Sequence, residues 1–210
     1  MTIGDVVTQL KYGELRSISI KDDNAAIVSY INLALVALYS RFNLKISEVI
    51  IPLSHNIVEY KLPSDCMTVQ SIFDENGDEF SLDDDANRFG IFQVDFETLQ
   101  VANPGTGASI GVIYITSPIS LVFTTNDDLT KIVPIPPQLL EPLLHYIGYR
   151  AHGSMDGDIK AENNTHFMRY EASCRRIEAL GLIRKPIPGA HVNMAESISD
   201  SNIDYTDLTE

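Results

Sequence analysis

Residues 132–151 read IVPIPPQLLEPLLHYIGYRA and mark the point where helical periodicity returns to the chain. A proline at the first helical position has its φ angle already set and lacks only an amide donor that the helix does not need. The stretch therefore predicts a helix that begins at Pro136 or Pro137. The apolar side chains on one side of this helix are Leu140, Leu143, Leu144, Ile147 and Ala151.

A second helix is predicted to follow, from about residue 161 to about residue 180. Its apolar positions are three or four residues apart, and they are Phe167, Tyr170, Cys174 and Ile177. Gly181 is expected to close it, because glycine accepts the left-handed conformation that ends many helices. Only the short segment 153–158 separates the two helices, so they are expected to form an antiparallel hairpin.

Two further helices are predicted before residue 46. Thr2 can cap a short helix over residues 2–11, and Asp22 and Asp23 can cap a longer one that ends near residues 43–45. The most apolar segment, residues 27–39, is shorter than the ~20 residues of a membrane span. It is therefore expected to be a core helix, and no membrane association is expected.

Between these helix pairs the periodicity changes to that of strands. Short apolar runs bounded by turn residues occur at 49–51, 57–62, 69–73, 79–82, 91–96, 99–101 and 111–116. Asn76-Gly77 is the preferred dipeptide of a type I′ hairpin turn. This region is expected to form a small antiparallel β module.

The predicted fold class is α+β: an antiparallel bundle of about four helices with the β module inserted between the second and third helices. The expected divisions are N-terminal helices (1–45), the β module (46–131), the helical hairpin (132–184) and an extended acidic tail (185–210). The tail has too few apolar residues to offset the entropy of ordering it alone. It is expected to be mobile in the free protein, or ordered on a partner.

The charge balance restricts the function. With 15 Lys+Arg against 29 Asp+Glu, the formal charge is −14, which argues against binding of phosphate backbones. Residues 1–5 lack the pattern of a signal peptide, so export is not expected. The two cysteines have no metal or redox spacing.

No catalytic, cofactor or metal site is expected. Glu141, His145 and His152 can be drawn on one helix face, but a further metal ligand is not identifiable. The acidic segments 83–85 and 156–162 are more typical of solvated turns and caps than of calcium loops. The glycine-rich segment 105–109 joins strands and has no lysine, and no nucleophile motif is present.

Partner-binding residues are expected in two places. The helical hairpin can present a basic stripe to an acidic neighbour, formed by Arg150, Arg169, Arg175 and Arg176. The alternative is that these arginines pair with Glu162, Glu171 and Glu178 along the same helix surface. The apolar points of the tail are Ile198, Ile203, Tyr205 and Leu208.

The order of elements, and residues 132–151 in particular, resemble the head-to-tail adaptor proteins of tailed bacteriophages, also called head-completion or tail tubular proteins. The resemblance lies in the proline-led helix with Tyr146-x-x-x-Arg150-Ala151, the acidic loop after it and the spaced aromatics Phe167 and Tyr170. It covers most of residues 1–182.

The resemblance implies a non-enzymatic virion protein, assembled in the cytoplasm of the host bacterium. Such a protein forms a homo-oligomeric ring, typically a dodecamer, beneath the portal protein. It closes the filled capsid, lets DNA pass without specific binding, and docks the downstream tail or nozzle protein. Residues 185–210 are the candidate segment for clasping the portal or a neighbouring copy.

Three alternatives remain open from the sequence. One is another virion ring or tail-completion protein. The second is an acid hydrolase of cell-wall glycans that uses two carboxylates of the β module. The third is an acidic DNA mimic that inhibits a basic enzyme.

Overall fold

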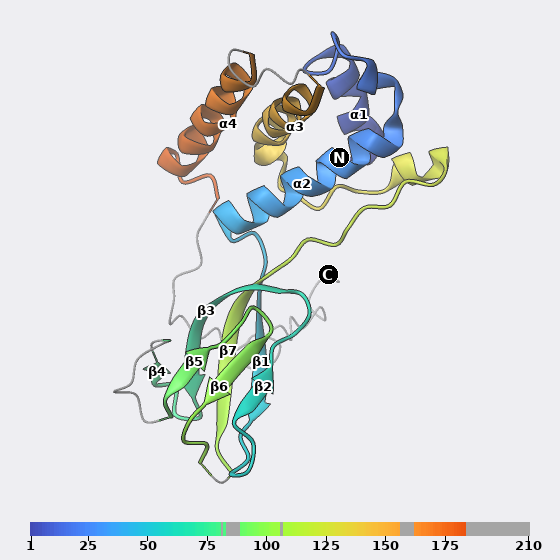
Figure 1. Ribbon diagram of the computed structural model, residues 1–210. Helices are drawn as coiled ribbons and strands as arrows, with labels where there is room; N and C mark the ends of the chain where they lie inside the picture. The colour runs from blue at the N-terminus through green and yellow to red at the C-terminus, as the bar shows by residue number, and fades with distance from the viewer. Residues whose placement is uncertain (81, 83–88, 106, 156–161, 184–210) are drawn as a thin grey trace, which may run out of the picture.

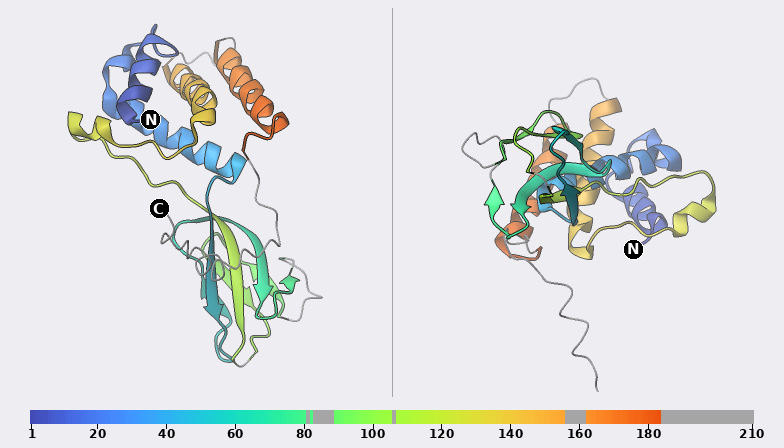
Figure 2. Two further views of the ribbon diagram at one scale, coloured as in Figure 1. Left: turned by 180° about the vertical axis from the view of Figure 1, so that it is seen from behind. Right: turned by 90° about the horizontal axis from the view of Figure 1, so that it is seen from below.

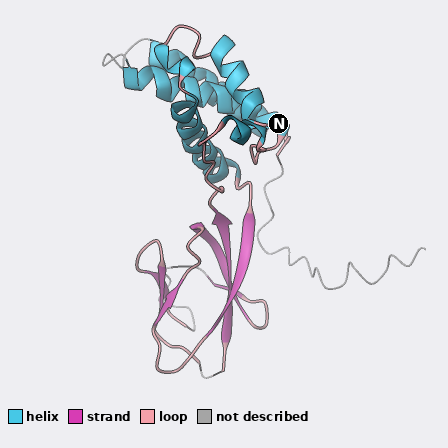
Figure 3. Cartoon of the chain, turned by 90° about the vertical axis from the view of Figure 1, so that its right-hand side faces the viewer, coloured by secondary structure: helices cyan, strands magenta, loops and turns pink. Residues whose placement is uncertain are grey.

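The computed structural model describes residues 1–80, 82, 89–105, 107–155 and 162–183. In this part of the chain it has four α-helices and two small antiparallel sheets, which confirms the predicted α+β class. The helices lie at one end of an elongated molecule and the strands at the other (Figure 1, Figure 3). The predicted extended tail, residues 185–210, lies outside the described residues.

The first two helices begin at the predicted caps. Helix α1 spans Ile3–Tyr12, and Thr2 and Asp5 form a reciprocal capping box at its start. Helix α2 spans Asn24–Phe42 and begins at Asp23, whose carboxylate accepts a hydrogen bond from the Ala26 amide. It ends at Asn43, which adopts the left-handed conformation.

The third helix begins later than predicted. Pro137 opens a 3-10 turn over Pro137–Leu139, and helix α3 follows at Leu140–Met155. The Leu139 amide donates to the Pro136 carbonyl, which closes the tighter turn before the α-helical pattern starts.

Helix α4 spans Glu162–Ala179 and ends at the predicted glycine. Gly181 has φ of +60°. The amides of Gly181 and Leu182 donate to the carbonyls of Glu178 and Ile177, which is the Schellman arrangement.

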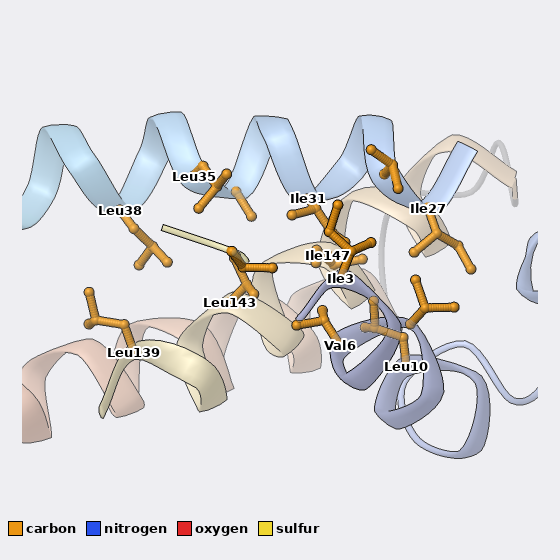
Figure 4. Packing of buried hydrophobic residues seen from close by; sticks show 14 of the residues in the cluster. Ile3, Val6, Leu10, Ile27, Ile31, Leu35, Leu38, Leu139, Leu143 and Ile147 are labelled. Atoms are coloured by element: carbon orange, nitrogen blue, oxygen red, sulfur yellow. The ribbon is translucent and has the colours of Figure 1, made fainter. Parts of the chain in front are cut away.

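One apolar core joins the helices. Figure 1 shows α3 and α4 side by side, with α2 running across them. In Figure 4 the side chains of α2 point toward Leu143 and Ile147 of α3 and toward Val6 and Leu10 of α1. The residues of α2 that are buried in this core are Ile27, Val28, Ile31, Ala34, Leu35, Leu38 and Phe42.

The β module contains two sheets, where the sequence predicted only an antiparallel unit. One sheet has the order β1-β7-β3-β4, and the other β2-β6-β5. The strands span Ile46–Pro52 (β1), Glu59–Lys61 (β2), Cys66–Asp74 (β3), Glu79–Phe80 (β4), Ile91–Gln93 (β5), Thr98–Val101 (β6) and Ser109–Thr116 (β7). The sheets share a second apolar core that includes Leu62, Ile72, Ile91, Leu99, Ile110 and Val112.

Two local predictions in the module were wrong. Gly77 has φ of +85°, but Asn76 does not have the positive φ that a type I′ turn requires. The carboxylate of Asp74 accepts hydrogen bonds from the amides of Asn76 and Asp78, which favours a type I turn followed by left-handed Gly77. Strand β5 ends at Gln93, because the next residues turn back and the Val94 amide donates to Thr98.

The segment after β7 returns to the helices (Figure 1, Figure 2). Leu121, Phe123 and Leu129 pack against the helical core, and a 3-10 turn, η2, spans Asn126–Thr130. The Ile3 amide then donates to the Lys131 carbonyl, so this segment covers the start of α1.

Candidate interaction site

The four predicted arginines lie on the helical hairpin and are exposed. Arg150 belongs to α3, and Arg169, Arg175 and Arg176 belong to α4. Arg176 pairs with Glu141 of α3, so this contact joins the two helices. Arg150 and Arg169 have no ion pair with any residue of the described part of the chain.

The expected pairing along α4 is present only in small part. Arg175 lies 3.8 Å from the Glu171 carboxylate one turn away, and the Glu162 side chain lies outside the described part. Glu171 and Glu178 instead receive Arg41 of α2, at 2.6 and 3.0 Å. Glu171 therefore lies between Arg41 of α2 and Arg175 of α4, and its shorter contact is with Arg41.

The apolar points of the tail, Ile198, Ile203, Tyr205 and Leu208, lie outside the described residues. Their role in partner binding stays a prediction.

A partly buried polar cluster lies where the segment after α1 meets α3 and α4. Glu14 Oε1 lies 3.0 Å from His145 Nδ1. Glu14 Oε2 lies 2.6 Å from His166 Nδ1, outside hydrogen-bond geometry. His152 Nε2 lies 2.9 Å from the Glu14 carbonyl and donates to it, and the His152 and His166 rings stack 4.7 Å apart. Glu14 thus forms hydrogen bonds with two histidines of α3 and approaches a third on α4.

The charges in this cluster act on one another. The hydrogen bond from His145, with the charges of His166 and Arg169, holds the pKa of Glu14 below its usual range. Burial is the main cause that lowers the pKa of His166, and it outweighs the opposing effect of Glu14. An adjacent cleft of about 400 Å³ is also lined by Arg16, Ser17, Thr165 and Arg169.

The cluster does not have the arrangement of a metal site. Within the described residues, no group of three or more His, Cys, Asp or Glu side chains is placed to hold a metal ion. His145 and His152 both form a hydrogen bond with Glu14, which the sequence analysis did not include. Glu141, the third residue of the expected helix face, has its carboxylate 3.7 Å from His145. The acidic segment 83–85 and residues 156–161 are outside the described part.

Sequence reasoning missed Glu14 and His166, because the residues of this cluster are contributed by segments more than 130 positions apart. No spacing along one helix identifies such a group. The net charge of each part of the chain, in contrast, can be counted from the sequence. Residues 46–116 contain 12 acidic and two basic side chains, so they carry −10 of the formal charge of −14.

The rest of the charge is distributed differently. Residues 1–45 and 117–183, which contain the helices, have 11 basic and 12 acidic side chains and are almost neutral. Residues 184–210 carry −3. The β module, whose strands all lie within residues 46–116, is therefore the main acidic part of the chain.

Helix α2 is long and apolar enough, by length and composition alone, to cross a membrane. Its residues Ile27, Ile31, Leu35 and Leu38 are fully buried in the helical core. This burial is typical of a core helix of a globular domain, and it agrees with the expectation from the sequence.

Comparison with known proteins identifies the family. The model of the SU10 adaptor protein family matches residues 1–185, which include all the helices and strands described above. No curated protein matches the chain. The match confirms the resemblance found from residues 132–151 and the elements around them. The chain therefore belongs to the SU10 adaptor protein family of phage head-to-tail adaptors, and is a structural protein of the virion.

Proposed function

We propose that the chain forms a ring beneath the portal, closes the DNA-filled capsid and docks the tail. Its partners in this proposal are the portal protein, a downstream tail or nozzle protein and further copies of itself, twelve in the ring. It acts as a structural protein and not as an enzyme. The family match over residues 1–185 supports an adaptor role.

The observation that carries the proposal is the separation of charge between the two ends of the molecule. The β module holds −10, while the helical part is nearly neutral. In a ring, the charges of all the modules add, and DNA phosphates are repelled from a surface of the same sign. An acidic passage of this kind lets DNA move without being held.

The arginines and the tail are the proposed attachment sites. Arg150, Arg169 and Arg175 are exposed on one helical hairpin and suit an acidic surface on a neighbouring subunit. Arg176 is partly engaged by Glu141 and is expected to contribute less. Residues 185–210 are proposed to clasp the portal or a neighbour.

Sedimentation with purified portal tests the proposal. The full chain should sediment with the portal, and a chain that ends at residue 184 should bind it far less. A triple variant, Arg150→Gln, Arg169→Gln and Arg175→Gln, should bind less tightly than the wild type, and the difference should be largest at low salt, because salt screens the charge contribution that the variant lacks. If the full chain stays in the supernatant, or if deletion of residues 185–210 leaves binding unchanged, the corresponding part of the proposal is wrong.

A further inference from the structure

Helix α2 has an exposed face without any charge. The exposed positions are three or four residues apart, and they are Ala25, Ser29, Leu33, Val36 and Ser40. Leu33 and Val36 leave 44% and 45% of their surface exposed. The sequence has no charged side chain from Asn24 to Ser40.

The segment after β7 extends this surface. The Thr116 amide donates to the Lys45 carbonyl beyond the C-terminal end of α2. Further along, the Asn32 side chain accepts from the Leu121 amide and donates to the Leu121 carbonyl, both at 2.8 Å. Residues 117–121 therefore run beside α2 from its end to its middle.

This segment borders the exposed face and not the opposite side of α2. Asn32 lies one turn from both Ser29 and Val36, so the Leu121 backbone is adjacent to the exposed positions. The segment adds Ile119, which is 78% exposed, and Val122, which is 58% exposed. Residues 117–126 also contain no charge. We call Leu33, Val36, Ile119 and Val122, with the small residues between them, the α2 face.

A face of this composition is typical of a buried contact. A helix that is apolar all round is normally covered on all sides, whereas α2 has only its inner side covered by the helical core. Charged residues are depleted at the centre of protein interfaces and occur at their rims. Here the nearest charges along α2 are Asp23 and Arg41, at its two ends.

The charge distribution indicates what covers the face. Two copies of a chain with −14 repel each other, and most of this repulsion comes from the β modules with −10 each. The helical part, with 11 basic and 12 acidic side chains, has almost no net charge. Copies can therefore approach closely through their helical parts, where the α2 face is the charge-free surface. In a closed ring each copy contacts the next one head to tail, so one surface of a copy packs against a different surface of its neighbour.

We propose that the α2 face of each copy packs against a different surface on the helical part of the next copy in the ring, with the acidic β modules held apart. The proposal rests on the proposed ring function and names the surface that forms the ring.

The test uses two double variants with the same change in chemistry. Leu33→Glu with Val36→Glu places two charges on the α2 face, and glutamate is a good helix former. The control, Ile50→Glu with Val94→Glu, changes two aliphatic residues of the β module that are 68% and 59% exposed. A third variant, Leu33→Gln with Val36→Gln, removes the apolar surface without adding charge, and circular dichroism confirms which variants are folded.

The measurement is titration of purified portal with each full-length protein, followed by native mass spectrometry of the complexes. Contact between neighbours makes binding of successive copies cooperative. We expect the wild type and the control to fill the portal cooperatively. The α2-face variants should bind as single copies with the wild-type affinity of the first copy. The affinity of the copies that follow should be lower than in the wild type by about tenfold or more.

The possible results separate the inference from the proposed function. Cooperative filling by the α2-face variants overturns the inference and leaves the proposed function standing. Loss of single-copy binding in those variants assigns the face to the portal, which also overturns the inference. Failure of the wild type to bind the portal overturns both.

Discussion

Oε1 of Glu14 lies 3.0 Å from Nδ1 of His145, and this contact joins the segment after α1 to helix α3. The other carboxylate oxygen lies 2.6 Å from Nδ1 of His166 on α4. A single side chain thus links three parts of the helical core at a partly buried position. The stability of the helical part is therefore expected to depend on the protonation of this cluster.

Mild acid should destabilise the protein through His166. Burial lowers the pKa of this histidine below its ordinary value of 6.5, so the unfolded chain takes up the proton more readily. Stability should therefore fall as the pH falls below 6.5, and His166→Gln should reduce this dependence. Melting temperatures of the wild type and of His166→Gln between pH 7.5 and 5.5 measure this dependence. The control variant is His55→Gln, because His55 is exposed. Equal slopes for the wild type and His166→Gln would contradict the assignment.

Protonation of the Glu14 carboxylate should affect the stability of the protein in a lower pH range than protonation of His166. Its pKa is lowered, mainly by the hydrogen bond from His145, so its contribution is complete above the ordinary value of 4.5. The contribution is lost as the pH falls through the folded-state pKa. Glu14→Gln should lower the melting temperature at pH 7 and flatten its decline below pH 4.5. A decline as steep as that of the wild type would assign the acid response to other carboxylates.

Gly148 lies at the close approach of α3 to this cluster. A Cβ atom there would lie 3.0 Å from His166 Nδ1 and 3.1 Å from Glu14 Oε2. Gly148→Ala should reduce the free energy of unfolding by about 1–3 kcal/mol, as overpacking of a filled site does. Urea denaturation measures this change. In a Glu14→Ala background the cost should be smaller, and an equal cost in both backgrounds would mean that the crowding does not involve Glu14.

Asp128 should hold the turn η2 in place. Its carboxylate accepts from the amides of Thr124 and Thr125, and its other oxygen lies 2.6 Å from Lys131 Nζ. These contacts hold the pKa of Asp128 well below its usual range, so its contribution is present above pH 3.8 and is lost on further acidification. Asp128→Asn should lower the melting temperature at pH 7. Asp127→Asn, at the exposed neighbouring position, should not, and similar effects of both would contradict this role.

Asn32 should fix the segment that borders the α2 face. Asn32→Ala removes both hydrogen bonds to the Leu121 backbone. Partly buried peptide groups then lose their partners, and the free energy of unfolding should fall by about 1–3 kcal/mol. Hydrogen exchange should show faster exchange of the Leu121 amide. Unchanged exchange at that amide would show that the segment is held by its apolar contacts alone.

The helices could be predicted because their signals are local. Thr2, Asp23 and Gly181 mark helix ends through bonds within a few residues, and the three-and-four spacing identifies the buried side of α2. The start of α3 was placed too early, because a proline pair is compatible with a 3-10 turn as well as with an α-helix.

The sheets and the polar cluster could not be predicted in the same way. Strand β1 pairs with β7, from Ile46 with Ile115 to Pro52 with Ser109, and no local pattern specifies a partner so distant in the chain. The hairpin turn was misassigned because Asp74 binds the turn amides with its own carboxylate. Glu14 was overlooked because its partners, His145 and His166, are contributed by the opposite end of the chain.

Electron microscopy of purified portal incubated with the full chain would show directly whether the ring forms. We expect an added ring on one end of the portal, with twelve copies, helical parts in contact and acidic β modules around an open channel. A portal without added density, or copies bound singly without forming a closed ring, would contradict it.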